Sequence, residues 1–404
     1  GKYPVIFLTF KDVKFNTWEE TFSAVRDIFA KETQRHEELR TSDRCDEYDE
    51  RKYARLAEGN VTEVELSSAL ADLSAMLHKH YGTAPVIIID EYDTPIQQGY
   101  MKGYYEEITL FMRNLFSGGF KDNKHLAFGF LTGILRVAKE SIFSGMNNLS
   151  INSVLDHKYS AYFGFTPDEV REMAAYYGAS DKYDEICEWY DGYRLIAHRQ
   201  TENECYSMYS PKSVVEAMLR HKFGTYWNQT ETYEALKIYI QMDMDGLKDS
   251  VVRMLAGESV PINIGTFSND MTTFATKDDV LTLLVHLGYL TYDSVDGTVS
   301  IPNKEVSREY VNAISTMNWH GVAESVESSR KLLEALWDMD ADAVATGIEK
   351  AHEEISILQY NDENSLSCTI QLAFYFAREY YTMIREMPAG KGFADICMVP
   401  RKKH

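Results

Sequence analysis

The stretch Ala84-Pro85-Val86-Ile87-Ile88-Ile89-Asp90-Glu91-Tyr92-Asp93-Thr94-Pro95 decides how the rest of the chain is interpreted. Its four consecutive β-branched aliphatic residues do not alternate with polar ones. They therefore predict a strand that is buried on both faces, as in a parallel sheet flanked by helices. Ligands of open α/β sheets bind beyond the carboxyl ends of the strands, where Asp90 and Glu91 follow at once. By itself the stretch fits a nucleotide site and a solvated acidic turn equally well.

The two carboxylates have the pattern of a Walker B segment. In that chemistry one carboxylate holds Mg²⁺, often through its water shell, and the second orients or deprotonates the attacking water. The pattern alone does not say which of Asp90 and Glu91 would take which role, and the neighbouring segments must decide between a nucleotide site and an acidic turn.

The segments around this strand predict a repeating order of strands and helices. Residues 5–10 and 125–133 are further apolar strand candidates. Helices are expected from about Thr17, with a capping box at 16–19, and from the capping box at 62–65 to Gly82. A third helical face covers 104–116. Strand, helix, strand, helix, strand with right-handed crossovers gives a parallel sheet with helices on both faces.

Two residues after the third strand could act at the same site. Thr132 ends the strand next to the acidic one, where a polar side chain often senses the γ-phosphate and aligns the attacking water. Arg136 could supply positive charge to the phosphates. Taken singly, a turn threonine and a surface arginine are the commoner explanations.

Composition narrows the class of protein. The 404 residues are enough for two or three domains, and the net charge of -21 disfavours a surface that binds nucleic acid or acidic membranes as a whole. Five scattered cysteines without a CxxC pair argue against a disulfide framework and a zinc site, which favours a reducing cytoplasm. The sequence shows no bilayer-spanning apolar run and no signal peptide.

The middle of the chain changes character. Residues 167–245 are acidic, rich in tyrosine and tryptophan, and expected to be largely helical, with Trp189-Tyr190-Asp191-Gly192-Tyr193 as the densest aromatic run. Aromatic clusters can stack nucleic-acid bases, but packing is the better explanation here because basic residues are sparse. A helix from Lys277 followed by strands 289–292 and 298–301, joined through Asp296-Gly297, outlines a winged helix.

The C-terminal part is expected to contain a helical linker over about 319–358, a long helix over about 364–387 and a strand over 393–399. Asp395 lies in that strand after a glycine turn, where it could hold a metal or simply face water. Glu363 precedes the long helix and is a weaker candidate for an additional acid, since first-turn acids also favour the helix dipole.

The order of these features resembles the bacterial AAA-ATPase-like proteins that carry a C-terminal PD-(D/E)XK nuclease-like domain. The resemblance covers nearly the whole chain and depends on four stretches: Ile89 to Pro95, Leu131 to Asn148, Trp189 to Tyr193, and Gly392-Phe393-Ala394-Asp395.

The resemblance implies a specific site and cofactors. ATP and Mg²⁺ would bind a P-loop domain with Asp90 on the metal side, Glu91 as the catalytic carboxylate and Thr132 as the sensor. Asp395 would be a metal-binding acid of the nuclease fold.

The fold class expected is α/β. A P-loop NTPase-type parallel sheet, truncated at its N-terminus, is followed by a helical region, a winged-helix-like module and the start of a nuclease-like α/β domain. The corresponding division is 1–165 for the ATPase-like core, 166–245 for an aromatic-rich lid, 246–316 for the winged-helix-like module and 317–404 for linker helices and the nuclease-like start.

Two departures qualify this resemblance. No GxxxxGK[ST] string, which would cradle the phosphates, occurs in the chain, and no Glu-x-Lys strand follows Asp395. The missing parts are expected upstream of Gly1 and downstream of His404, so the chain is expected to be a fragment without efficient ATPase or nuclease activity.

Several functions stay open at this point. The first is an ATPase coupled to a nuclease that acts on nucleic acid, and the second is a signalling-type NTPase switch that binds without cleaving. A glycosidase acid pair has little support, because adjacent acids at one strand end are poorly placed to flank a sugar bond. A homo-oligomer is compatible with either of the first two functions.

Overall fold

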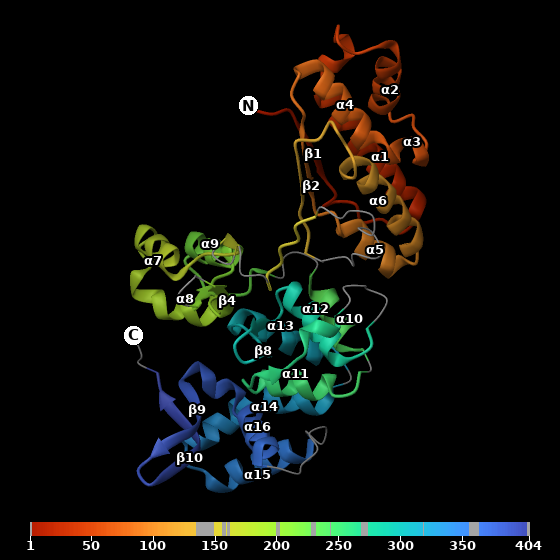
Figure 1. The fold of residues 1–404 in the computed structure, drawn as a ribbon. Coiled ribbons are helices and arrows are strands. Elements are labelled where there is room, and N and C mark those ends of the chain that lie inside the picture. Colours follow the sequence, from red (N-terminus) through yellow and green to blue (C-terminus); the bar gives the residue numbers. More distant parts are fainter. Residues whose placement is uncertain are drawn as a thin grey trace. The chain divides into compact units, whose positions relative to one another are not determined.

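The computed structural model describes residues 2–134, 149–155, 159, 162–198, 203–227, 232–242, 244–267, 274–317, 319–354 and 363–401. The chain divides into two compact units (Figure 1). The first unit is Gly1–Ile151 with Phe267–Phe274, and the second is Asn152–Thr266 with Ala275–His404.

Three parallel strands form the sheet of the first unit. They are β1 (Val5–Thr9), β2 (Val86–Asp90) and β3 (Phe128–Leu131), in the order β1-β2-β3. The register pairs Thr9 with Asp90 and Ile89 with Leu131, so the three strands end at one edge of the sheet. The expected parallel sheet is therefore present, and the acidic strand β2 lies at its centre.

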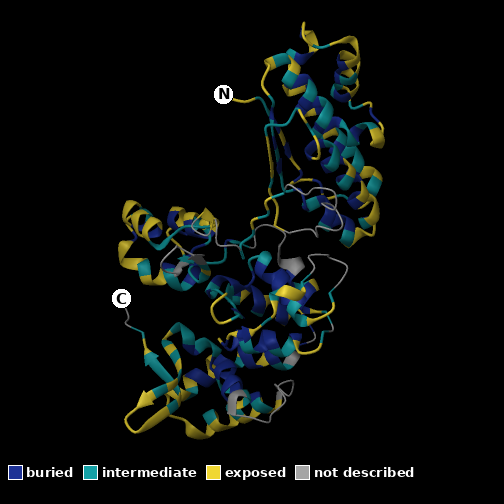
Figure 2. Ribbon diagram, in the orientation of Figure 1, coloured by how far each residue is buried: buried dark blue, intermediate teal, exposed yellow. Residues whose placement is uncertain are grey.

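The sheet is buried on one face only. Ile6, Ile87 and Ile89 are fully buried, whereas Phe7 is 47% exposed and Phe128 is 57% exposed. The helices lie on the buried side (Figures 1 and 2). They are α1 (Trp18–Arg35), α2 (Glu47–Ala57), α3 (Glu63–Ser67), α4 (Ala69–Tyr81), α5 (Thr94–Lys102) and α6 (Tyr105–Phe120).

The expectation that helices cover both faces of this sheet is thus wrong for the described residues. Four β-branched residues in a row suit a strand that is fully buried, but here only alternate members of β2 reach the core. The aliphatic run itself does not tell these two cases apart.

Helix ends follow the expected caps with one shift. The side chain of Thr17, not Asn16, caps α1 by accepting from the Glu20 amide. The capping box of Thr62 and Glu65 opens α3, which ends before α4 begins, so the single helix expected here is two. Gly82 ends α4 in the left-handed region, with φ at 68°.

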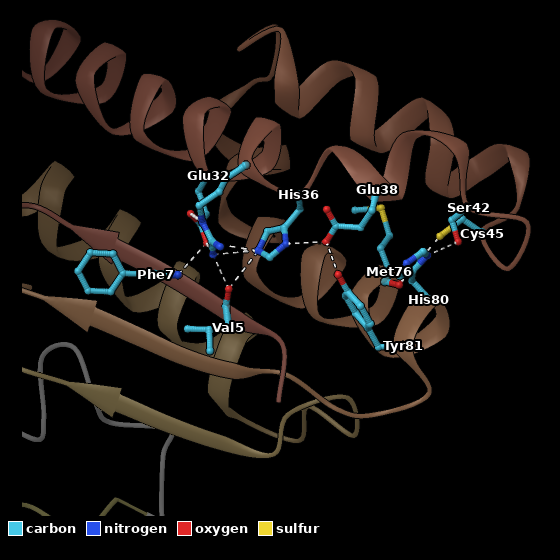
Figure 3. A network of polar contacts seen from close by, with 11 residues as sticks. Val5, Phe7, Glu32, His36, Glu38, Ser42, Cys45, Met76, His80 and Tyr81 are labelled. Atoms are coloured by element: carbon cyan, nitrogen blue, oxygen red, sulfur yellow. Dashed lines mark hydrogen bonds and ion pairs between the residues drawn. The ribbon is translucent and has the colours of Figure 1, made fainter. Parts of the chain in front are cut away.

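Backbone groups on the outer side of β1 form hydrogen bonds with side chains and not with a further strand (Figure 3). The Phe7 amide donates to Glu32 Oε1 at 2.7 Å, and an Arg35 Nη2 donates to the Val5 carbonyl at 2.5 Å. His36 Nε2 lies 3.0 Å from the same carbonyl, and its Nδ1 lies 3.1 Å from Glu38 Oε1. The edge is thereby closed to pairing with another strand at these positions.

Burial and hydrogen bonding shift the pKa values of Glu32 and His36 in opposite directions. Burial alone would raise the pKa of Glu32, but hydrogen bonds from Arg35, His36 and the Phe7 amide hold that pKa below its ordinary value. Burial alone would lower the pKa of His36, but its bonds to Glu32 and Glu38 outweigh burial and raise that pKa above 6.5. The folded state therefore favours a charged cluster.

In its described residues, the second unit contains three small antiparallel sheets among helices. Two-stranded sheets pair β4 (Tyr193–His198) with β5 (Asn203–Met208) and β9 (Tyr381–Ala389) with β10 (Gly392–Pro400). A three-stranded sheet has the order β6-β8-β7, from β6 (Val260–Pro261), β7 (Thr291–Asp293) and β8 (Thr298–Ser300). The α-helices are α7 (Pro167–Tyr176), α8 (Tyr183–Tyr190), α9 (Pro211–Arg220), α10 (Thr232–Ile240), α11 (Leu247–Leu255), α12 (Lys277–His286), α13 (Lys304–Ser315), α14 (His320–Trp337), α15 (Ala341–Glu354) and α16 (Glu363–Ala373).

One expectation for this unit is incomplete and one is wrong. The described residues of 167–245 are largely helical as expected, but they also contain the β4-β5 hairpin, which was not predicted from the sequence. The long helix expected to Met387 ends at Ala373, and a short 3-10 helix, η6 (Tyr375–Glu379), leads into β9. The residues of β9 alternate between half-buried and exposed, which is the period of a strand, not of a helix. The hairpin of β7 and β8 and the helix after it are confirmed.

The motif from Trp189 to Tyr193 is built into the packing of this unit. Trp189 and Tyr190 are buried in a core with residues of α7 and α9. Gly192 has φ at 120°, and a Cβ there would overlap the Pro302 carbonyl. Glycine is thus required at this position for two reasons, the backbone conformation and the close approach of another segment.

Stability of the β1 edge should depend on pH through His36. A raised folded-state pKa means that the stabilisation is complete below pH 6.5 and is lost as the pH rises through the raised pKa. We expect His36→Gln to reduce hydrogen-exchange protection of β1 most near pH 6, with a smaller difference from the wild type near pH 9. A difference that does not change between these pH values would contradict the protonated state of His36.

Gly192→Ala should destabilise the second unit by several kcal/mol, because the new methyl group meets backbone and not a flexible side chain. Gly178→Ala is the matched control, since Gly178 also has a positive φ, 69°, but nothing lies within 4 Å of its ideal Cβ. Urea unfolding followed by tryptophan fluorescence compares the two variants. Equal losses of stability would exclude the clash with Pro302 as the cause.

Candidate functional site

The carboxyl edge of the first sheet brings three side chains together. The Thr132 hydroxyl donates to Asp90 Oδ1 at 2.5 Å, and the Thr9 hydroxyl lies 3.4 Å from Asp90 Oδ2. Each of the three residues ends or directly follows a different strand of the sheet. Asp90 is half-buried and both threonines are exposed, so the edge is open to a ligand.

Backbone bonds hold this edge in place beyond the last strand residues. The Phe10 amide donates to the Asp90 carbonyl at 3.0 Å, and the Thr132 amide donates to the Ile89 carbonyl at 2.8 Å. The Tyr92 amide in turn donates to the Thr132 carbonyl at 3.1 Å. Thr9, Asp90 and Thr132 are therefore positioned by the sheet itself and not by a flexible loop.

Glu91 occupies an unusual backbone conformation. Its φ is 55°, in the left-handed region that non-glycine residues adopt at a cost of about 1–2 kcal/mol. Its Oε2 accepts a hydrogen bond from the Thr94 hydroxyl at 3.1 Å, at the first residue of α5. The contacts described for its carboxylate are thus with α5 and not with Asp90 or Thr132.

Asp93 fixes the segment that follows Thr132. Its carboxylate is fully buried, and its Oδ2 accepts from Gln97 Nε2 at 2.9 Å and from the Ile134 amide at 3.1 Å. A Cβ at Gly133 would overlap this carboxylate, so the close approach requires glycine. Asp93 therefore couples the start of α5 to the segment that follows β3.

Thr9 and Asp93 also belong to this site, although neither was predicted from the sequence. Thr9 had a usable signal, because it is a polar residue at the carboxyl end of a neighbouring parallel strand. Asp93 had none beyond its proximity to Asp90, since its burial depends on the fold of residues 133–134.

The other predicted site residues do not join this edge in the described structure. Arg136 lies outside the described residues. Asp395 is an exposed residue of β10, and its neighbours Ala394 and Ile396 pair with Met387 and Arg385. Glu363 is the first residue of α16, and its side chain lies outside the described part of the chain. Asp395 belongs to the second unit and Asp90 to the first.

The donor set at the carboxyl edge consists of oxygen atoms alone, which suits Mg²⁺. Among the described residues no three His, Cys, Asp or Glu side chains are placed together to hold a metal ion. Nucleotide-bound Mg²⁺ takes one or two protein carboxylates and completes its shell with water and phosphate oxygens. Asp90 with two flanking hydroxyl groups therefore fits such an ion.

Comparisons with known proteins give a family match and a distant relative. Residues 1–143 match the model of a family described as "Predicted AAA-ATPase". A 172-residue segment is 31% identical to an uncharacterized protein in the vnfD 5′ region of Azotobacter chroococcum mcd 1. That alignment covers 42% of this chain and 32% of the relative. No solved structure matches the chain.

The described residues include no helix that is both long and apolar enough to cross a membrane.

Asp93→Ala should lower the free energy of unfolding by about 1–3 kcal/mol, because the Ile134 amide and the Gln97 side chain lose their acceptor. It should also speed hydrogen exchange at residues 132–134. Glu106→Ala is the control, since Glu106 is an exposed acid in the first turn of α6. If both variants leave exchange at 132–134 unchanged, Asp93 does not hold this segment.

Proposed function

We propose that the carboxyl edge of the β1-β2-β3 sheet binds the phosphates and Mg²⁺ of ATP and takes part in ATP hydrolysis. The observation that carries this proposal is the Asp90 carboxylate, placed between the hydroxyl groups of Thr9 and Thr132 at the ends of three adjacent parallel strands. The match of residues 1–143 to a predicted AAA-ATPase family supports it independently.

Asp90 is the residue that holds the metal. The Thr132 hydroxyl donates to one of its oxygens, which fixes the orientation of the carboxylate and leaves the second oxygen beside Thr9. A bound Mg²⁺ neutralises charge that develops on the phosphate oxygens during phosphoryl transfer. Thr132 thus has two roles in the proposal, positioning Asp90 and sensing the terminal phosphate.

Glu91 is the proposed catalytic carboxylate. Its left-handed backbone sets it apart from the strand that ends at Asp90, and strained conformations of this kind gather at functional sites. Its hydrogen bond from Thr94 orients the side chain while leaving Oε1 for a water molecule. Arg136 is proposed to contribute positive charge beside the phosphates.

The second unit is proposed to contain the winged-helix-like and nuclease-like parts, with the four-part division of the chain given above. The order β6-β8-β7 together with α11, α12 and α13 supports the winged-helix-like module. The succession of α16, β9 and β10, with Asp395 on the second strand, supports a nuclease-like start that acts on nucleic acid. The alternative is a signalling-type NTPase switch in which this part binds without cleaving.

Replacement of the catalytic carboxylate tests the proposal. In the natural full-length protein, Glu91→Gln should reduce the rate of ATP hydrolysis by about 10²-fold or more while ATP affinity changes little, because Gln keeps the shape but cannot accept a proton. The measurement is steady-state phosphate release with a parallel nucleotide-binding assay.

Glu107→Gln is the matched control, since Glu107 is exposed in the first turn of α6 and makes no contribution to the proposed site. Unchanged hydrolysis in Glu91→Gln would refute the catalytic role of Glu91. Loss of hydrolysis in both variants would mean that charge on this unit, and not a catalytic carboxylate, is responsible.

A further inference from the structure

A cavity of about 560 Å³ in the second unit gathers basic side chains from distant parts of the sequence. Lys304 and Arg308 come from α13, Arg378 from η6, and Arg401 follows β10. Glu188 and Glu379 are the acidic residues on its wall. The wall thus has an excess of positive charge in a chain whose net charge is -21.

Three of these cations share the two carboxylates. Lys304 Nζ and Arg401 Nη1 lie 3.1 Å and 2.8 Å from the oxygens of Glu188, and Arg308 Nη2 lies 3.6 Å from Glu379 Oε1. The indole ring of Trp189 also holds two of them, with Lys304 Nζ at 5.0 Å and Arg308 Cζ at 4.4 Å from its centroid. Trp189 and its carboxylate neighbours therefore hold the cations in place before any ligand binds.

Arg378 forms a hydrogen bond with a neutral backbone group, whereas the other three cations pair with carboxylates. Its Nη1 donates to the Leu255 carbonyl at 2.8 Å, and a Cβ at Gly257 would lie only 3.0 Å from its Nη2. Burial lowers the pKa of Arg378, and the nearby charge of Arg401 lowers it further. Positive charge therefore accumulates on the wall of this cavity, and a bound anion would offset it.

Two buried donors on the cavity wall have no hydrogen-bond acceptor among the described residues. Asn303 is 9% exposed, and its Oδ1 accepts from the Val306 amide at 3.0 Å, which leaves Nδ2 without a partner. Arg401 Nε is buried without a partner as well. Buried donors are nearly always paired, so these two groups indicate an acceptor that the described chain does not supply.

We propose that this cavity binds the phosphate group of a nucleotide-sized ligand. Guanidinium groups match phosphate oxygens in pairs, and Arg308, Arg378 and Arg401 lie together on the wall of this cavity. The volume exceeds that of a free phosphate ion and lies in the range of small-molecule sites. The phosphate could belong to a free nucleotide or to the end of a nucleic-acid strand.

This site does not depend on the nucleotide site proposed at Asp90. Its residues belong to the second unit, and it is built from donors and cations without a metal-binding carboxylate pattern. Binding can therefore be measured in the presence of EDTA, where a metal-dependent site contributes nothing.

The test is isothermal titration of the whole chain, in EDTA, with inorganic phosphate, with AMP and with a short single-stranded DNA that has a 5′-phosphate or a 5′-hydroxyl. Asn303→Asp keeps the acceptor that caps α13 and replaces the donor with a negative charge. It should weaken binding of the phosphate probes by more than ten-fold, and Arg308→Gln by about ten-fold.

Arg171→Gln is the matched control, because Arg171 lies on α7 in the same unit, pairs with Asp168 and packs over the Tyr183 ring, but does not line the cavity. It should leave binding unchanged. Thermal unfolding of each variant separates loss of binding from loss of folding.

Either source of the phosphate supports the proposal. AMP that binds as well as the phosphorylated DNA indicates a free nucleotide, and DNA that binds more tightly, with a strong preference for the 5′-phosphate, indicates a strand end. Absence of binding by every phosphate probe would overturn the proposal. Equal binding by Asn303→Asp and Arg171→Gln in folded proteins would overturn it as well.

Discussion

Parallel pairing of β2 with β1 and β3 is the constraint on which the first unit depends. The strands keep one register across the sheet, so Thr9, Asp90 and Thr132 reach the same edge although they are far apart in the sequence. Backbone bonds that continue past Asp90 and Thr132 hold the edge. The side chains at this edge would need little further ordering to bind the proposed ion or phosphate, which would lower the entropic cost of binding.

The outer side of strand β1 in the same sheet is closed by a charged cluster. Glu32, Arg35 and His36 take the hydrogen bonds of the Phe7 amide and the Val5 carbonyl that another strand would otherwise take. Buried charges are costly unless they are paired, and this cluster is paired internally and with backbone. The cluster thus closes the sheet at β1. Among the described residues, β2, which carries Asp90, has one strand on each side.

The sequence was sufficient to predict those elements that are determined by a few neighbouring residues. The strand before Asp90, the capping box at Thr62 and the turn at Gly297 were predicted because each depends on a few neighbouring residues. The burial of only one face of the sheet was not predictable, since it depends on what packs against the strands. The change from α16 to β9 was missed because residues 374–387 contain apolar residues that fit either period.

One candidate site was predictable from the sequence and the other was not. Asp90 and Thr132 were predicted to act together because both follow parallel strands, and the structure places them in hydrogen-bond contact. The cavity beside Trp189 was missed, since Lys304 and Arg308 are close in sequence but Arg378 and Arg401 are not. Sparse basic residues along the sequence can still form a concentrated site when the fold brings them together.

The central claim is that Asp90 holds the metal ion of a nucleotide at the sheet edge. Electron paramagnetic resonance with Mn²⁺ in place of Mg²⁺ tests it directly, by titration of the natural full-length protein in the presence of ATP. We expect a protein-bound Mn²⁺ signal in the wild type that is lost in Asp90→Asn and kept in Asp122→Asn, which alters an acid outside the site. An equal bound signal in wild type and Asp90→Asn would contradict the claim.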